Sequence, residues 1–230
     1  MSVNSSGDFR SVVDALEYSA ETNPTQTAIT CRNTHITYEE LNRSTAHLAN
    51  ALHATGFRPG NVALLLLSPH TPHYLIAQYG LWKAGGVTLT ADFDITTHDL
   101  RQMLQRTNAN TAFVASNRYR QFRQAWRGTN ARRVVVARHT EYLSRWDTLH
   151  FKLRHERAGG HLIDQRPTHM RWRNVLKLGE KAPAVNVGIS AETIAQLDPQ
   201  NFTPIVHQNL TSSAAEHFRM ASNILIASDF

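Results

Sequence analysis

Six consecutive apolar residues, Val62–Leu67, constrain the fold of this 230-residue chain more than any other feature. The turn-forming residues Arg58–Asn61 precede the run, and Ser68–Pro72 follows it. A strand without a polar face is buried on both sides, which is typical of a parallel sheet covered by helices on both faces. The run is the longest apolar stretch of the chain. It is far shorter than the roughly 20 residues of a membrane-spanning helix.

The first half of the chain alternates helical and strand-like patterns with short connections. Apolar residues at helical spacing predict helices over about 9–21, between Thr37 and Gly56, between Pro72 and Gly85, from Thr97 to Asn108, and over about 118–126. Apolar runs predict strands over residues 28–31, 35–37, 62–67, 87–89, 112–115 and 133–137. This alternation predicts an α/β fold: a largely parallel sheet with helices on both faces.

Local signals mark where several of these helices begin and end. Thr37 and Glu40 have the spacing of a capping box, in which each side chain bonds the other residue's backbone amide. Gly56 supplies the left-handed residue that ends the same helix. Thr97 is predicted to cap the helix that follows it.

The regular pattern is lost after Arg138. Residues 139–182 hold scattered aromatic residues and many arginines without a sustained period, and a last helical pattern covers about 211–224. We therefore expect an α/β subdomain over residues 1–138, an irregular basic segment over 139–200 and a C-terminal part over 201–230.

Positive charge is concentrated in one stretch of the chain. The formal net charge is +6, but residues 118–177 alone contain 15 arginines and lysines against four acidic residues. Interleaved aromatic residues such as Trp126 and Trp146 add the stacking groups that non-specific single-strand binding uses. However, 20 of the 24 basic residues are arginine, so the enrichment is a chain-wide bias. A nucleic-acid-binding module is therefore the weaker hypothesis.

Other residue types lead to no assigned site. Cys31 is the only cysteine, which excludes an intrachain disulfide and predicts a buried thiol. His150 and His155 are five residues apart, which is the wrong rotation for zinc ligands on one helix, and His70 and His73 flank a proline at a helix start. Because the N-terminus does not resemble a secretory signal, we expect a soluble cytoplasmic protein.

Several segments together resemble a known family. Ile36–Asn42, Leu48–Leu52, Gly56–Leu64 and Leu81–Val87 resemble, in order and spacing, the start of the AMP-forming acyl-CoA synthetase and adenylation-domain superfamily. The resemblance extends from about Phe9 to Val136. It implies the N-terminal subdomain of an adenylate-forming ligase. Such enzymes join a carboxylate to ATP, with Mg²⁺, and pass the acyl group to a thiol such as that of CoA.

The resemblance also indicates what is missing. In the family, a glycine-rich loop with a lysine grips the ATP phosphates just before a segment that Val206–Leu210 resembles. Here Asp198–Ile205 occupies that place, and no glycine follows Gly188 and no lysine follows Lys181. We expect an eroded phosphate loop, with Thr203–Pro204 as its remnant, and no C-terminal half. No catalytic, cofactor-binding or metal-binding residue is assigned.

Three hypotheses follow from these patterns. The first is a truncated acyl-CoA-synthetase-like protein that is inactive alone and self-associates or docks on a complementary ligase chain. The second is the N-terminal half of a split carboxylate–CoA or carboxylate–carrier ligase. The third is the nucleic-acid-binding module of Arg118–Lys177.

Overall fold

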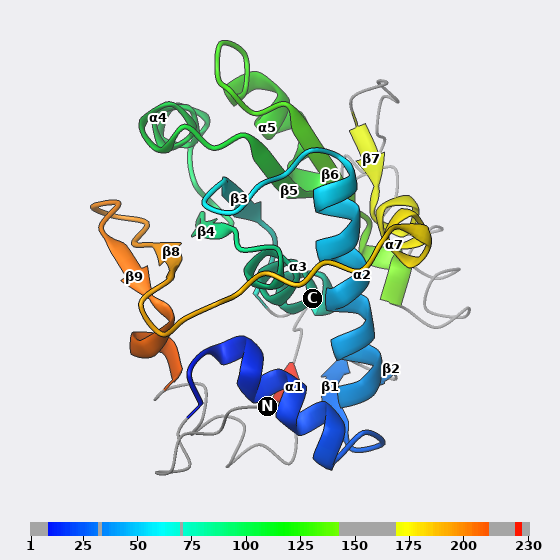
Figure 1. Cartoon of the computed structure of the whole chain (residues 1–230). Coiled ribbons are helices and arrows are strands. Elements are labelled where there is room, and N and C mark those ends of the chain that lie inside the picture. Colours follow the sequence, from blue (N-terminus) through cyan, green and yellow to red (C-terminus); the bar gives the residue numbers. More distant parts are fainter. Residues whose placement is uncertain (1–8, 32–33, 70, 143–168, 212–223, 227–230) are drawn as a thin grey trace.

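The main sheet has seven strands and is parallel except at one edge (Figure 1). The computed structural model describes residues 9–31, 34–69, 71–142, 169–211 and 224–226. In spatial order the strands are β7 (His169–Arg171), β6 (Arg133–Ala137), β5 (Thr111–Ala115), β3 (Val62–Leu66), β4 (Val87–Thr90), β8 (Ile194–Leu197) and β9 (Pro204–Val206). Only β9 is antiparallel to its neighbour, so β8 and β9 form a hairpin at the sheet edge.

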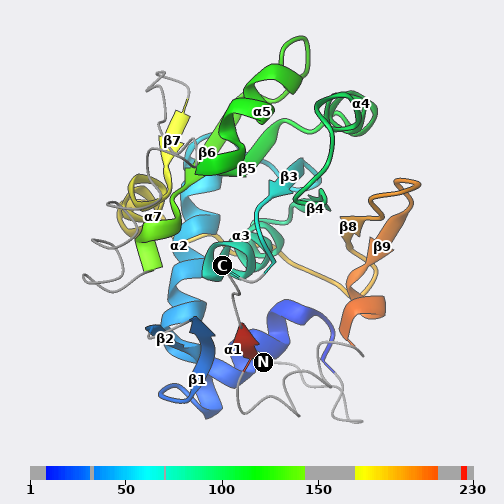
Figure 2. The same ribbon diagram turned by 180° about the vertical axis from the view of Figure 1, so that it is seen from behind.

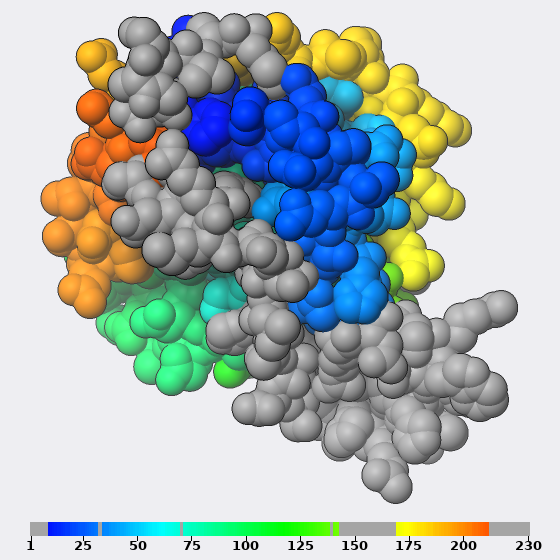
Figure 3. Space-filling model, turned by 90° about the horizontal axis from the view of Figure 1, so that it is seen from below, coloured from blue at the N-terminus to red at the C-terminus, as the bar shows by residue number. Residues whose placement is uncertain are grey.

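A smaller sheet lies at the other end of the molecule. The strands β1 (Thr27–Cys31) and β2 (Thr34–Thr37), both predicted from the sequence, pair antiparallel, and β10 (Ile224–Ile226) pairs parallel with β1. Seen from below, the N-terminal part of the chain, which includes α1, lies between α7 on one side and the β8–β9 hairpin on the other (Figure 3). The helix expected over about 211–224 lies almost wholly outside the described residues.

Helices cover both faces of the main sheet (Figures 1 and 2). One face carries α1 (Val12–Thr22), α2 (Tyr38–Ala54), α3 (Pro72–Lys83) and α7 (Trp172–Lys181), and the other carries α4 (Thr97–Thr107) and α5 (Tyr119–Ala125). Successive residues of β3 point to opposite faces. Leu65 therefore packs in the core under α2 and α3, whereas Leu64 and Leu66 pack in the core under α4 and α5. The α/β prediction is confirmed.

The predicted helix ends are confirmed at α2 and displaced by one residue at α4. The Thr37 amide donates to the Glu40 carboxylate at 2.9 Å, and the Glu40 amide donates to the Thr37 hydroxyl at 3.2 Å. Gly56 follows with a φ of 84°. The prediction that Thr97 caps α4 is wrong. Thr96 is the cap, because its backbone is extended and its hydroxyl accepts from the amide of Asp99.

Part of the segment predicted to be irregular is in fact regular. Residues 169–181 form β7 and α7, and a short 3-10 helix, η2, covers His139–Tyr142. Trp172, Val175 and Gly179 are the buried residues of α7, and Trp172 is among the largest fully buried side chains of the protein. The strand spans only three residues, and the helix contains Gly179, a poor helix former, so neither element was predicted. Residues 143–168 lie outside the described part.

A close contact between backbones seats α7 on α2. A Cβ atom built on Gly179 would overlap the carbonyl oxygen of His47 in α2. The Asn50 side-chain amide donates to the carbonyl of Gly179 at 3.3 Å, which holds the two helices in this register. Only a residue without a side chain fits this contact.

Among the described residues, the histidines His73 and His207 are buried. The Nε2 atom of His73, at the start of α3, lies 3.0 Å from the carboxylate of Glu141. Burial lowers the pKa of His73, and the hydrogen bond and charge of Glu141 oppose that effect. His207, after β9, is 1% exposed, and burial lowers its pKa to about 4. Within the described residues, no helix combines the length and the apolar composition needed to cross a membrane.

The Gly179→Ala variant should lose stability because the new methyl group cannot fit against the His47 carbonyl. We expect a loss of about 2 kcal/mol or more in the free energy of unfolding, measured with urea. The matched control is Gly188→Ala, whose added Cβ would meet no atom within 4 Å. Equal stability of the two variants would contradict the seating of α7 on α2.

Stability should also fall in acid because of His207. A histidine in the unfolded chain binds a proton below its ordinary pKa of 6.5, whereas the folded state resists protonation down to about 4. The free energy of unfolding should therefore decrease as the pH falls through this window. The decrease should be smaller in His207→Gln than in the wild type and unchanged in His98→Gln, whose ring is on the surface. Identical pH profiles for all three proteins would show that His207 is not buried in the neutral form.

Candidate functional site

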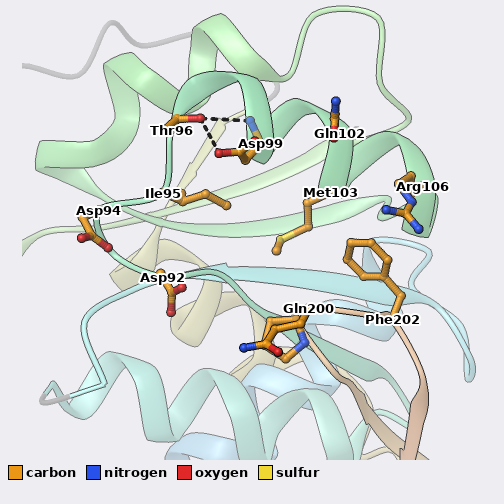
Figure 4. Close-up of a pocket in the computed structure, with 11 residues that line it drawn as sticks. Asp92, Asp94, Ile95, Thr96, Asp99, Gln102, Met103, Arg106, Gln200 and Phe202 are labelled. Atoms are coloured by element: carbon orange, nitrogen blue, oxygen red, sulfur yellow. Dashed lines mark hydrogen bonds between the residues drawn. The ribbon is translucent and has the colours of Figure 1, made fainter.

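A cavity of about 470 Å³ opens where β4 ends (Figure 4). Its walls are the loop that follows β4, one side of α4 and the turn of the β8–β9 hairpin. Ligands of open α/β sheets bind outside the carboxyl ends of the parallel strands, and the volume is in the range of small-molecule sites. Position and size make this cavity the candidate functional site.

The charged residues of the cavity wall are mainly acidic. The carboxylates of Asp92, Asp94 and Asp99 line it together with a single guanidinium, that of Arg106. Asp99 accepts a hydrogen bond of 2.7 Å from the hydroxyl of Thr96. Arg106 lies over the ring of Phe202, 4.7 Å from its centroid. Three carboxylates against one already engaged guanidinium disfavour a polyanion such as a triphosphate.

The hairpin turn satisfies its own backbone amides. The Asp198 carboxylate accepts from the amides of Gln200 at 2.8 Å and Asn201 at 3.1 Å. The Phe202 amide donates to the Asp198 carbonyl at 2.9 Å, and the Thr203 amide donates to the Asn201 side chain at 2.9 Å. Four consecutive amides therefore have partners within the turn. An anion-binding loop instead leaves its amides free to point at the ligand.

The backbone of this turn is unusual in one respect. Phe202 has a φ of 61°, in the left-handed region that glycine ordinarily occupies. Its ring packs under Arg106 at the mouth of the cavity. A side chain therefore fills the space that a glycine would leave open for close approach of a ligand to the backbone.

The other residues considered from the sequence do not form a site in the described structure. Cys31 is buried at the end of β1, as predicted. His73 is paired with Glu141, and its ring packs edge-on against Tyr142 and Trp172. Across the described residues, no group of three or more potential metal ligands comes together. His70, His150, His155 and His161 lie outside the described part.

The cavity residues were not predicted from the sequence. Asp92 and Asp94 follow a strand directly, which is a signal for a position at the carboxyl edge of the sheet. The opposite wall comes from Pro199 to Phe202, about a hundred residues further along the chain. No local pattern connects two such distant segments.

Part of the basic segment lies within the described residues. Arg118 lies over the Phe93 ring, 4.5 Å from its centroid, and Arg173 donates to the carbonyl of Glu141. The remainder, residues 143–168, is outside the described residues, so nucleic-acid binding by Arg118–Lys177 stays a prediction.

Comparison with known proteins gives relatives that act on carboxylic acids. The fatty acid–[acyl-carrier-protein] ligase ScoC of Streptomyces coeruleorubidus is 28% identical over 106 residues, which is 46% of this chain and 20% of that protein. A feruloyl-CoA synthase of Amycolatopsis is 36% identical over 90 residues, 39% of this chain and 18% of that protein. The chain thus spans about a fifth of the length of these relatives.

Solved structures share the fold. A benzoate CoA ligase from Burkholderia xenovorans superimposes with a TM-score of 0.69 at 19% identity, covering 90% of this chain and 36% of that one. A long-chain fatty-acid-CoA ligase from Archaeoglobus fulgidus gives 0.67 at 18% identity, covering 94% and 40%. The family model described as AMP-binding enzyme matches residues 16–183, which is most of the chain. The resemblance of the sequence is confirmed, and the chain belongs to the AMP-binding enzyme family.

Proposed function

We propose that this chain provides the N-terminal framework of an adenylate-forming acid–thiol ligase and does not activate a carboxylate by itself. Family membership and the α/β scaffold support the first part. The named relatives ligate fatty, ferulic and benzoic acids to a carrier protein or to CoA, so the proposed substrate class is a carboxylic acid. The state of the β8–β9 hairpin supports the second part.

The hairpin is the observation that carries the proposal. Its turn lies just before Val206–Leu210, which resembles the segment that follows the phosphate loop in the family. Its amides are bonded to the side chains and carbonyl of the turn itself, and two of them donate to an internal carboxylate, that of Asp198. The aspartates of the adjacent cavity add like-charge repulsion. ATP would have to displace these hydrogen bonds and enter a negative field.

Groups that hold the triphosphate would then have to come from outside this chain. The proposal therefore includes association with a complementary ligase chain or with a second copy. Among the described residues, the large apolar side chains that remain exposed are Tyr18, Leu178 and Ile194, on α1, α7 and β8. They offer surface for such contacts on three different elements.

The purified 230-residue chain should form no acyl-adenylate. With ATP, Mg²⁺ and hydroxylamine, no hydroxamate above background is expected from a panel of fatty, aromatic and amino acids, and no acid-dependent exchange of pyrophosphate into ATP. The benzoate CoA ligase of Burkholderia xenovorans, assayed in parallel, is the positive control. Product above background from any acid would overturn the proposed inactivity.

The internal hydrogen bonding of the turn amides can be tested separately from activity. In Asp198→Ala, the amides of Gln200 and Asn201 lose their partner and should exchange with solvent about fivefold faster, the equivalent of a hydrogen bond of about 1 kcal/mol. In Asn201→Ala, the amide of Thr203 should respond instead. Exchange is measured by NMR, with the buried strand β5 as the internal reference. Unchanged exchange rates in both variants would mean that these side chains do not bond the amides of the turn.

A further inference from the structure

Arg58 and Arg133 bond the carboxyl end of α2, and Arg132 adds a third positive charge beside Arg133. Arg58 follows the helix, and its Nη1 donates to the carbonyl of His53 at 3.3 Å. Arg133 reaches the same helix end from the start of β6, and its Nε donates to the carbonyl of Thr55 at 2.8 Å. Arg132 is its neighbour in the chain. Because the two carbonyls are two residues apart, the guanidinium groups of Arg58 and Arg133 are held close together.

The cluster holds more positive charge than the helix end requires. The carboxyl end of a helix carries the equivalent of about half a negative charge, against three full positive charges here. None of the three arginines makes an ion pair with another residue in the described ranges. Burial lowers the pKa of Arg133, and the charges of Arg58 and Arg132 lower it further. The excess charge is thus repulsive within the protein.

The cluster is also accessible. Arg58 and Arg132 are exposed, and Arg133 is half-buried. A guanidinium presents five N–H groups in a flat fork. The bonds above use only part of this capacity and hold Arg58 and Arg133 in place. A planar fork of this kind matches a carboxylate, which accepts two parallel hydrogen bonds.

Other described arginines are engaged differently. Arg106 and Arg118 stack on aromatic rings, and Arg101 donates to the carbonyls of Gln124 and Ala125. Nucleic-acid backbones require a stripe of charges that follows regularly spaced phosphates. Three guanidinium groups around one helix end form a compact patch instead. A short run of carboxylates fits this patch better than an extended polyanion.

We propose that Arg58, Arg132 and Arg133 form a docking surface for an acidic, Asp- and Glu-rich segment of a partner protein. The surface lies at the amino end of β6, whereas the cavity lies at the carboxyl end of β4. Since both strands belong to the parallel part of the sheet, the two sites lie at opposite ends of the strands. A partner bound here leaves the cavity clear, and the proposal does not depend on the proposed function.

The test is binding of a labelled octaglutamate peptide to the full chain, measured by fluorescence anisotropy at low salt. Arg58→Glu/Arg132→Glu should weaken binding about tenfold or more, because two attractive contacts become repulsive. Arg120→Glu/Arg127→Glu is the matched control, since it changes the net charge equally at two exposed arginines of α5 and the turn after it. It should change the Kd less than about twofold. Circular dichroism checks that both variants are folded.

Several outcomes would overturn the proposal. One is equal weakening in the two double variants, which would indicate a general charge effect. Another is the absence of peptide binding to the wild type. Tighter binding of inorganic phosphate or of a single-stranded oligonucleotide at the same residues would assign the surface to a different ligand. Self-association of the free chain that Arg58→Glu/Arg132→Glu abolishes would assign it to a second copy.

Discussion

Burial of β3 on both faces is the constraint on which the rest of the structure depends. Leu64 and Leu66 face one core and Leu65 faces the other, so the sheet needs a helical layer on each side. Parallel strands in turn require crossover helices, and these bring all strands of the parallel part into one direction. The carboxyl ends and the amino ends of the strands consequently differ in chemistry. Loops such as Asp92–Ile95 follow the carboxyl ends, and residues such as Arg133 stand at the amino ends.

The features that the sequence predicts are those that local physics determines. The apolar run of β3, the capping box of Thr37 and Glu40 and the left-handed Gly56 each arise from a few neighbouring residues, and the structure contains all three. The helix α7 was missed because its stability comes from tertiary contact. Gly179, a poor helix former, is required by the His47 carbonyl of another helix. The cap of α4 was misplaced by one residue because Thr96 and Thr97 carry the same hydroxyl.

The candidate site was beyond sequence reasoning for a related reason. Its walls are contributed by segments about a hundred residues apart, and their meeting depends on the pairing of β8 with β4. The lack of glycine between Asp198 and Ile205 could be read directly from the sequence. Which atoms satisfy the amides of that turn could not. The carboxylate of Asp198 and the side chain of Asn201 accept hydrogen bonds from these amides, which explains how a turn without glycine is stable there.

Under the proposed function, this turn takes the place of a phosphate-binding loop without loss of the fold. A non-glycine residue in the left-handed region, here Phe202, costs roughly 1 kcal/mol or more. The hydrogen bonds of the turn, at about 1 kcal/mol each, and the contact of the Phe202 ring with Arg106 offset this cost. The interactions that stabilise the turn are the same ones that remove its free amide donors. Under the proposed function, stability of the scaffold and affinity for phosphate therefore oppose each other at this position, and the residues present favour the scaffold.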